Sequence, residues 1–278
     1  IVEAGAEVTN YKVGDRVVGE PHTRACGKCE LCRTGNIQIC SAKRSPGWGI
    51  DGAFTRYLVM PEHLLHAIPD SMTLDQATLA EPLSVGLYAV RLGELRPGMA
   101  IGVFGAGPIG LSVLLCAKAV VPVRAYVTEL IDRRLDVART CGADWTANAA
   151  ACDVAAEALA REPAGLDVVF ECSGDPRAID VSMAALKPGG TLVIVGIPAP
   201  QRVDFDIHVM RRKELTFKNV RRQRACVAPV VELVADGRLN PDPMLTHHFP
   251  LERTQEAFDL VAGYADGVIK AVIELGRE

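Results

Sequence analysis

Apolar and polar residues alternate in two different ways along the chain, and the change comes after residue 99. Beyond it, short apolar runs such as AIGVFG, VRAYVTE and TLVIVGIP are separated by segments with helical apolar spacing, such as PIGLSVLLCAKAV and IDRRLDVARTCGA. Continuous apolar runs are typical of strands buried on both faces. Their alternation with helices predicts a parallel α/β sheet, and APVVELVADG and LERTQEAFDLVAG predict two later helices.

The part of the chain before residue 90 has a different pattern. Runs such as KVGDRVVGEP and GAFTRYLVMPEHLLHAIPD are short, strand-like and punctuated by Gly and Pro. This pattern is typical of all-β structure with tight turns. At about 150 residues per domain, a chain of 278 residues has room for both regions as separate domains.

Composition and charge narrow the class of protein. Hydrophobic residues make up 49% of the chain and charged residues 23%, and the net charge is −4. These values are ordinary for a globular protein and leave no broad basic surface for nucleic acid. The longest apolar stretch, LSVLLCAKAVVPV, contains Lys118 and Pro122 and is too short to cross a bilayer. We therefore expect no membrane partner and a cytoplasmic location, where thiols stay reduced.

Four of the nine cysteines lie within fifteen residues, at C-x2-C-x2-C-x7-C spacing. Four close thiols could form disulfides, carry electrons, hold an iron–sulfur cluster or bind zinc. A reducing compartment disfavours disulfides, a bacterial ferredoxin run closes with C-x3-C-P, and a thioredoxin-like site needs one C-x2-C pair beside a βαβ unit. The spacing favours a closed structural zinc site, with Cys26, Cys29, Cys32 and Cys40 as its ligands. Such a site has no open position for a substrate, so the chemistry lies elsewhere.

A glycine-rich turn follows the first predicted strand of the parallel sheet. It reads GAGPIG over residues 105–110 and opens a predicted helix, which is the context of a dinucleotide-binding G-x-G-x-x-G motif. Glycines let the backbone approach a pyrophosphate, and the helix N-terminus supplies N–H donors. The candidate cofactor contacts in this turn are Gly105, Gly107, Pro108, Ile109 and Gly110.

An acidic residue ends the next predicted strand. Glu129 lies nineteen residues beyond Gly110, where a carboxylate accepts hydrogen bonds from the adenosine ribose and repels a 2′-phosphate. This position favours NAD over NADP. Arg133 and Arg134 complicate the choice, because an arginine near the ribose can hold a 2′-phosphate.

A four-cysteine lobe ahead of a glycine-rich dinucleotide turn resembles the zinc-dependent medium-chain dehydrogenases of the alcohol and polyol type, such as sorbitol and xylitol dehydrogenases. The resembling segments run from end to end in family order: VGDRVVGEP, CGKCELC, DGAFTRYLVMPEHLLHAIPD, AEPLSVGLYAV, GVFGAGPIGL, LKPGGTLVIVGIP, RRKELTFKNVRRQ and GVIKAVIEL. The resemblance implies an α/β plus β fold, with a Rossmann doubly wound sheet inserted in a GroES-like β-barrel domain. The expected divisions are residues 1–83 for the GroES-like domain, with the zinc lobe at 22–41, residues 84–223 for the NAD-binding domain, and residues 224–278 for a return to the barrel.

The same resemblance implies the reaction and its residues. Family members oxidise an alcohol, here a polyol or secondary alcohol, with NAD, and a catalytic zinc polarises the alcohol oxygen. In the polyol branch the third zinc ligand is a glutamate in the stretch that matches AEPLSV, which is Glu81 here. Further cofactor contacts are expected from Arg134, Val195, Gly196 and Arg222. A homo-oligomer, either a dimer or a tetramer, is also implied.

The family's catalytic Cys and His belong to blocks that this sequence does not contain. The chain begins at Ile1, where the family pattern continues directly after its G-H-E block, and on the order of 70 residues would precede it. With Glu81 as the one remaining ligand, we expect the 278-residue chain alone to be inactive. Histidines do not replace the missing ligands: His63 and His66 are expected outside the barrel and His22 in a loop.

Two alternatives remain open. Threonine dehydrogenases tend to carry Gly where this chain has Ser84, which leans the prediction toward polyols. Polyol enzymes often have an aromatic-Arg-Tyr run where this chain has Arg221, Arg222 and Gln223, which weakens the match to a sorbitol-type pocket. A non-catalytic module that binds NAD and zinc is the alternative from a different class.

Overall fold

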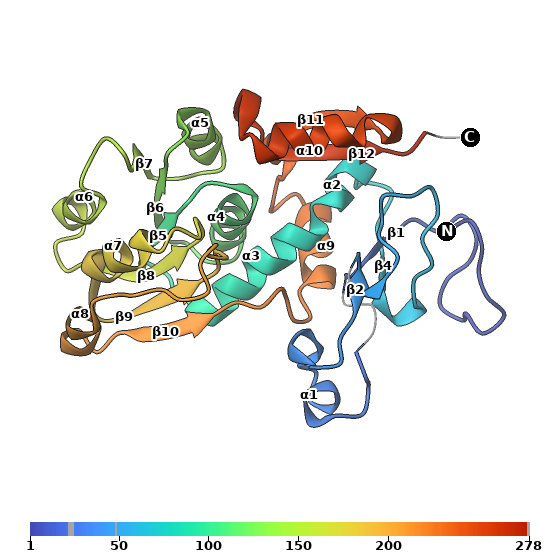
Figure 1. Cartoon of the computed structure of the whole chain (residues 1–278), viewed down its shortest axis with the longest axis horizontal. Helices are drawn as coiled ribbons and strands as arrows, with labels where there is room; N and C mark the ends of the chain where they lie inside the picture. The colour runs from blue at the N-terminus through green and yellow to red at the C-terminus, as the bar shows by residue number, and fades with distance from the viewer. Residues whose placement is uncertain (22–24, 48, 277–278) are drawn as a thin grey trace.

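The computed structural model describes residues 1–21, 25–47 and 49–276, and Figure 1 shows their arrangement. His22 and the first residues of the predicted zinc lobe therefore lie outside the described residues. Within the described part of the chain, no helix is long and apolar enough to cross a membrane.

A six-stranded parallel sheet forms the body of the molecule and confirms the predicted α/β region. Its spatial order is β10-β9-β8-β5-β6-β7, so the chain starts in the middle, winds to one edge and then to the other. The strands are β5 Ala100–Phe104, β6 Arg124–Glu129, β7 Trp145–Asn148, β8 Leu166–Glu171, β9 Leu186–Ile194 and β10 Thr216–Asn219. The helices between them are α4 Pro108–Val120, α5 Asp132–Thr140, α6 Val154–Arg161, α7 Arg177–Ala185 and α8 Ile207–Arg212.

Alternating side chains of these strands enter two separate cores. Ile101, Val103 and Phe170 pack on one face with α4, with α3 Ala80–Gly93 and with α9 Val227–Ala235. Phe104 and Val169 pack on the other face with α6 and α7. Because both faces are covered, the strands read as continuous apolar runs in the sequence.

Helices α3 and α4 approach each other closely at a glycine. A β-carbon added to Gly86 would lie 2.5 Å from the backbone carbonyl carbon of Ser112, so no larger residue fits without separating the helices. The thiol of Cys116 on α4 also donates to the backbone oxygen of Leu83 on α3, with a sulfur–oxygen distance of 3.3 Å. Helix α3 is thereby fixed against the helix that follows the glycine-rich turn.

The prediction of all-β structure up to residue 90 is wrong for residues 74–90. Helix α2 Leu74–Thr78 begins with a reciprocal capping box between Thr73 and Gln76, and α3 follows it directly. Helix α3 is buried nearly all round, so its sequence lacks the polar face that marks an amphipathic helix. It also runs without a break across residues 83 and 84, where the domain division was expected.

Strands are short in the part of the chain before α2. Two strands pair antiparallel, β1 Val17–Gly19 with β4 Leu65–Ala67, and β2 Ser45–Pro46 pairs with β3 Gly49–Ile50. One helical turn, α1 Glu30–Arg33, lies in the cysteine lobe, which projects away from the parallel sheet (Figure 1). The 3-10 turns of this region are Ile37–Ile39 and Glu62–Leu64.

The C-terminal segment adds a further small unit. Strands β11 Leu245–Pro250 and β12 Lys270–Glu274 pair in parallel, and α10 Thr254–Ala262 connects them. The 3-10 turns here are Asp242–Met244, Leu251–Arg253 and Ala265–Gly267. The last strand was expected to join the first domain's barrel, whereas the partner that the structure gives to β12 among the described residues is β11.

Candidate cofactor and metal sites

The glycine-rich turn packs tightly at two of its glycines and is open at the third. Gly105 has φ +100°, and an added β-carbon would lie 2.7 Å from the backbone nitrogen of Ser173; one at Gly110 would lie 1.8 Å from the backbone oxygen of Gly105. At Gly107 the nearest atom would be Nη1 of Arg134, at 3.7 Å. Gly105 and Gly110 therefore shape the turn, whereas Gly107 keeps a path open for a ligand to reach the backbone.

Helix α4 begins in this turn with its N-terminus uncapped. Gly107 is the N-cap residue and has no side chain to offer, and Pro108 occupies the first helical turn. Ile109 is partly exposed beside it. The free N–H groups and the positive end of the helix dipole fit a pyrophosphate. The residues of this turn therefore suit a dinucleotide.

Glu129 lies where the sequence predicts, at the C-terminal end of β6 beside the glycine-rich turn. Its Oε2 accepts from the backbone N–H of Ala106 at 2.8 Å. Its Oε1 accepts from the N–H groups of Leu130 and Ile131, at 2.8 and 3.3 Å. These bonds hold the carboxylate at the edge of the open turn.

The two arginines of α5 are both tied to the C-terminal segment. The buried Arg134 donates to the backbone oxygen of Val268 through Nη2, at 2.8 Å, and its guanidinium lies 5.2 Å from the ring centre of Tyr264. Arg133 donates to Oδ1 of Asp266 at 2.9 Å. Nη1 of Arg134 remains close to Gly107, so of the two residues Arg134 is the one beside the turn.

A second glycine turn, after β9, brings Val195 and Gly196 next to β8. Both backbone N–H groups donate to the backbone oxygen of Glu171, each at 2.8 Å. The buried carboxylate of Glu171 accepts from the N–H groups of Ser173 and Gly174, at 2.7 and 2.9 Å. The sequence reading missed Glu171, although an acidic residue at the end of an apolar strand and ahead of Ser-Gly was a usable signal.

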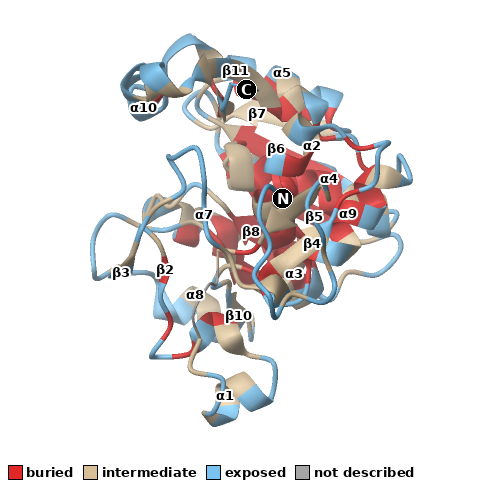
Figure 2. Cartoon of the chain, turned by 90° about the vertical axis from the view of Figure 1, so that its right-hand side faces the viewer, coloured by how far each residue is buried: buried red, intermediate tan, exposed pale blue. Residues whose placement is uncertain are grey.

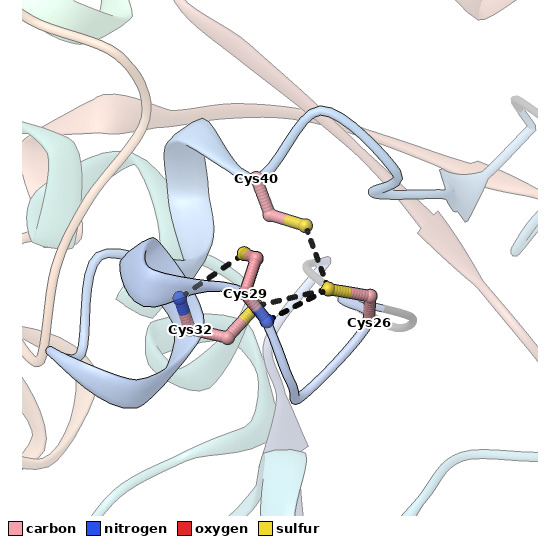
Figure 3. A group of neighbouring side chains, drawn as sticks. All are labelled: Cys26, Cys29, Cys32 and Cys40. Carbon is pink, nitrogen blue, oxygen red and sulfur yellow. Dashed lines mark hydrogen bonds between the residues drawn. The ribbon is translucent and has the colours of Figure 1, made fainter.

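The four predicted zinc ligands converge, as Figure 3 shows. All four sulfurs lie within 4.8 Å of one another, and Cys26 Sγ is 3.8 Å from the sulfurs of both Cys32 and Cys40. A disulfide would need about 2.05 Å, whereas tetrahedral zinc with Zn–S bonds of about 2.3 Å separates its sulfurs by about 3.8 Å. The donor set and its spacing therefore fit zinc.

Backbone N–H groups in the lobe point at the sulfurs. Cys29 N–H donates to Cys26 Sγ and Cys32 N–H to Cys29 Sγ, both with nitrogen–sulfur distances of 3.4 Å. The bond from Cys29 lowers the pKa of the Cys26 thiol to about 6, whereas burial and the neighbouring thiols raise the pKa of Cys32 to about 12. Four thiols this close can all lose their protons only beside a cation, which explains why such a cluster suits a divalent metal.

Glu81 lies in the first turn of α3 and is partly buried. Burial raises the pKa of its carboxyl group, and the charges of Lys270 and Arg222 oppose that rise. Among the described residues, the one group of three or more metal-binding side chains is the cysteine cluster, and Glu81 belongs to no such group. One carboxylate does not make a zinc site, so the described residues do not fit a catalytic zinc.

Arg222 stands in the left-handed region, with φ +56°, and its guanidinium donates to the backbone oxygen of Pro21 at 3.2 Å. The next residue, Gln223, is buried and donates to Oε2 of the buried Glu20 at 2.7 Å. His66 reaches the other oxygen of that carboxylate at 2.8 Å, a contact that the sequence did not predict. This polar cluster joins the first region to the turn after β10, and the sequence reading missed it.

Known proteins resemble the chain along its whole length. Residues 1–70 match the family model of the alcohol dehydrogenase GroES-like domain, and residues 108–236 match that of the zinc-binding dehydrogenases. Sorbitol dehydrogenase of Bacillus subtilis is 31% identical over 281 residues, covering 100% of this chain and 79% of its own length. L-Threonine 3-dehydrogenase of Legionella pneumophila is 32% identical over 274 residues, covering 97% and 79%.

A solved structure agrees. An oxidoreductase/dehydrogenase of unknown specificity from Escherichia coli superposes with a TM-score of 0.93 at 31% identity, over 99% of this chain and 80% of that one. These likenesses define an oxidoreductase with a Rossmann-type sheet and a GroES-like domain. The chain belongs to the zinc-dependent alcohol and polyol dehydrogenase family. The predicted family, fold class and cofactor class, zinc and a nicotinamide dinucleotide, are thereby confirmed.

Proposed function

We propose that the protein oxidises a polyol or secondary alcohol with NAD, and that Glu81 meets the substrate. The observation that carries the assignment of the site is the position of Glu81: a partly buried carboxylate with a raised pKa, flanked by Arg222 and Lys270, on the helix that packs against α4. Gly86 on α3 lies against Ser112 on α4. Glu81 is five residues from Gly86 along α3, and Pro108, at the start of α4, is four residues from Ser112. At 1.5 Å per residue, Glu81 and Pro108 each lie less than about 8 Å from this contact, measured along their own helices.

The dinucleotide is held by the glycine-rich turn and its neighbours. The pyrophosphate lies at Gly107 and the start of α4, with Pro108 and Ile109 beside it and Nη1 of Arg134 in reach. Glu129 accepts from the ribose hydroxyls, which favours NAD over NADP. Val195 and Gly196 border the nicotinamide half of the cofactor, which accepts the hydride when bound.

The metal roles differ between the two candidate positions. Cys26, Cys29, Cys32 and Cys40 bind one structural zinc, whose contribution is to fold the lobe. Glu81 is the family's zinc-ligand position, and in the described residues it stands without companions for that role. Its role toward the substrate is to accept a hydrogen bond from a hydroxyl group. The positive charge of Arg222 favours the ionised form of this carboxyl group.

The proposal includes three further expectations. We expect domain divisions at residues 83/84 and 223/224, a cytoplasmic location, and a homo-oligomer of two or four chains. All three are consistent with a dehydrogenase of this family. Sedimentation of the purified protein measures the oligomeric state directly.

The test uses the protein as its gene encodes it. NAD reduction is measured with a panel of polyols, secondary alcohols and L-threonine, beside zinc per chain. Glu81→Gln is expected to lower turnover by at least about 100-fold while dinucleotide binding stays unchanged, because loss of one group that contacts the reacting atoms has an effect of that order. The control, Glu232→Gln, removes an exposed carboxylate from α9. If no alcohol is oxidised by protein that binds NAD and zinc, the non-catalytic module is correct; if L-threonine alone is oxidised, the threonine dehydrogenase alternative is.

A further inference from the structure

The connection between α10 and β12, residues 264–268, binds two consecutive arginines of α5. Nη1 of Arg133 donates both to the backbone oxygen of Asp266 and to its Oδ1, each at 2.9 Å. Arg134 donates to the backbone oxygen of Val268 at 2.8 Å. The C-terminal segment lies beside α5 in Figure 1, so these bonds join the end of the chain to the helix that follows the ribose-binding strand β6.

The backbone of this connection has an unusual conformation. Tyr264, Asp266 and Gly267 all stand in the left-handed region, with φ +50°, +48° and +64°. Residues other than glycine in this region cost free energy and cluster at functional sites. A β-carbon added to Gly267 would lie 2.2 Å from Cδ of Arg133, so the glycine leaves the space in which that side chain lies. His247 reaches Oδ2 of Asp266 at 3.2 Å and holds the carboxylate from the other side.

Arg133 follows the predicted ribose acceptor closely. It lies four residues beyond Glu129, in the first turn of α5, and four residues span at most about 14 Å. Glu129 itself is fixed at the glycine-rich turn by the N–H of Ala106. An arginine near this acidic position is the group that accommodates a 2′-phosphate, and its guanidinium forms strong charge-assisted bonds with phosphate oxygens. An unpaired Arg133 would therefore favour NADP.

We propose that Asp266 is a specificity-determining residue for the dinucleotide, because its pairing with Arg133 keeps that guanidinium from a 2′-phosphate. The bond to Val268 meanwhile leaves Arg134 beside Gly107 at the glycine-rich turn. The inference rests on the proposed function, in which a ribose binds at Glu129. It extends that function by assigning part of the choice between NAD and NADP to a residue outside the parallel sheet.

The experiment measures the dissociation constants of NAD and NADP for the gene-encoded protein in the Glu129→Ser background, where the carboxylate that repels the phosphate is absent. Asp266→Asn removes the second carboxylate and keeps a side chain that tolerates the left-handed region. It should tighten NADP binding by about tenfold and change NAD binding by less than about twofold. Adding Arg133→Gln should cancel the gain. The matched control, Asp259→Asn, removes an exposed carboxylate from α10 and should change neither constant.

A second titration uses adenosine 2′,5′-bisphosphate and 5′-AMP, which lack the nicotinamide half. The gain from Asp266→Asn should appear with the bisphosphate alone, because only that compound carries the 2′-phosphate. No gain, an equal gain without Arg133, or the same gain in Asp259→Asn overturns this inference and leaves the proposed function standing. The gain in protein that oxidises no alcohol contradicts the proposed function and supports the role of Asp266. Failure to bind either dinucleotide contradicts both.

Discussion

The parallel sheet and the cysteine lobe are stabilised in opposite ways. All five residues of the central strand β5 are buried, and helices cover both faces of the sheet. In the lobe, over residues 25–41, only Gln38 and Cys40 are buried. Figure 2 shows the contrast, with buried residues gathered around β5 and α4 and the lobe around α1 mostly coloured as intermediate or exposed. Apolar burial can hold the sheet, whereas the lobe has too little of it, and under the proposal above it depends on a zinc ion bound by its four thiolates.

This difference predicts how each region fails. A sheet with two cores distributes its stability over many contacts, so one conservative change weakens it without abolishing it. A lobe held by one ion loses its order together with the ion. The predictions below test the contrast, from the largest expected effect to the smallest.

Replacing one zinc ligand should break the lobe and spare the sheet. Cys29→Ser is expected to remove the structural zinc completely and to expose residues 25–41 to hydrogen exchange and proteolysis. Dinucleotide affinity should change by less than about threefold, because the glycine-rich turn lies in the other region. Zinc analysis, hydrogen exchange and NAD titration on one preparation measure the three quantities.

A cysteine outside the lobe provides the control. Cys152 donates to the backbone oxygen of Asn148 at 3.6 Å and is not a ligand candidate, so Cys152→Ser should keep the zinc. Full zinc retention by Cys29→Ser would contradict the assignment of the site, and loss of NAD binding in that variant would show that the two regions are not independent.

Two glycines of the sheet region should separate folding from ligand binding. Gly110→Ala places a β-carbon 1.8 Å from a backbone oxygen and should lower the free energy of unfolding by about 2 kcal/mol. Gly107→Ala meets no atom closer than 3.7 Å, so unfolding should change by less than about 0.5 kcal/mol. Its NAD dissociation constant should nevertheless rise at least about tenfold, or about 1.4 kcal/mol, because the methyl group occupies the path of the pyrophosphate. Unchanged NAD affinity in Gly107→Ala would contradict the assignment of the dinucleotide-binding site to this turn.

The sequence predicted the sheet better than the rest because its signals are local. Each buried strand is a continuous apolar run, and the GAGPIG turn lies within six residues. The contacts that join the regions are not local: Glu20 meets Gln223, and Arg134 meets Val268, across 203 and 134 positions. Helix α3 was misread because burial on every side removes the polar face that signals a helix.

Glu129 should set the preference between the two dinucleotides, with a smaller effect. Glu129→Ser removes the acceptor for the ribose and the repulsion of a 2′-phosphate, so the preference for NAD should narrow by about tenfold. It should not reverse, because Arg133 is paired with Asp266 and Arg134 with the oxygen of Val268. Titrations with NAD and NADP measure the ratio, and Asp136→Asn on the exposed side of α5 is the control for charge. Tighter NADP binding by the unaltered protein would mean that Glu129 does not face the ribose.

The smallest expected effect lies at an ion pair beside the sheet. Glu162 accepts from Arg124 through both carboxylate oxygens, at 2.6 and 3.1 Å, and from the Tyr126 hydroxyl at 2.6 Å. The hydrogen bond from Arg124 holds the pKa of Glu162 below its ordinary value.

Because the pKa of Glu162 is lowered in the folded state, this ion pair stabilises the fold fully above the ordinary carboxyl pKa of about 4.3. The stabilisation is lost as the pH falls through the lower pKa of the folded state. Glu162→Gln should therefore cost about 1 kcal/mol of unfolding free energy at pH 7, and the difference should shrink below about pH 4. Glu157→Gln, which breaks an exposed ion pair with Arg161 on the helix that ends just before Glu162, should cost less than about 0.5 kcal/mol. Urea denaturation from pH 7 to pH 3, with zinc followed in the same samples, compares the two regions directly.

Zinc release should precede unfolding of the sheet, because protons compete with the metal for the thiolates at a higher pH than that at which they protonate the carboxylate of Glu162. A lobe that kept its zinc until the sheet unfolded would show that the lobe draws stability from the sheet rather than from the ion alone.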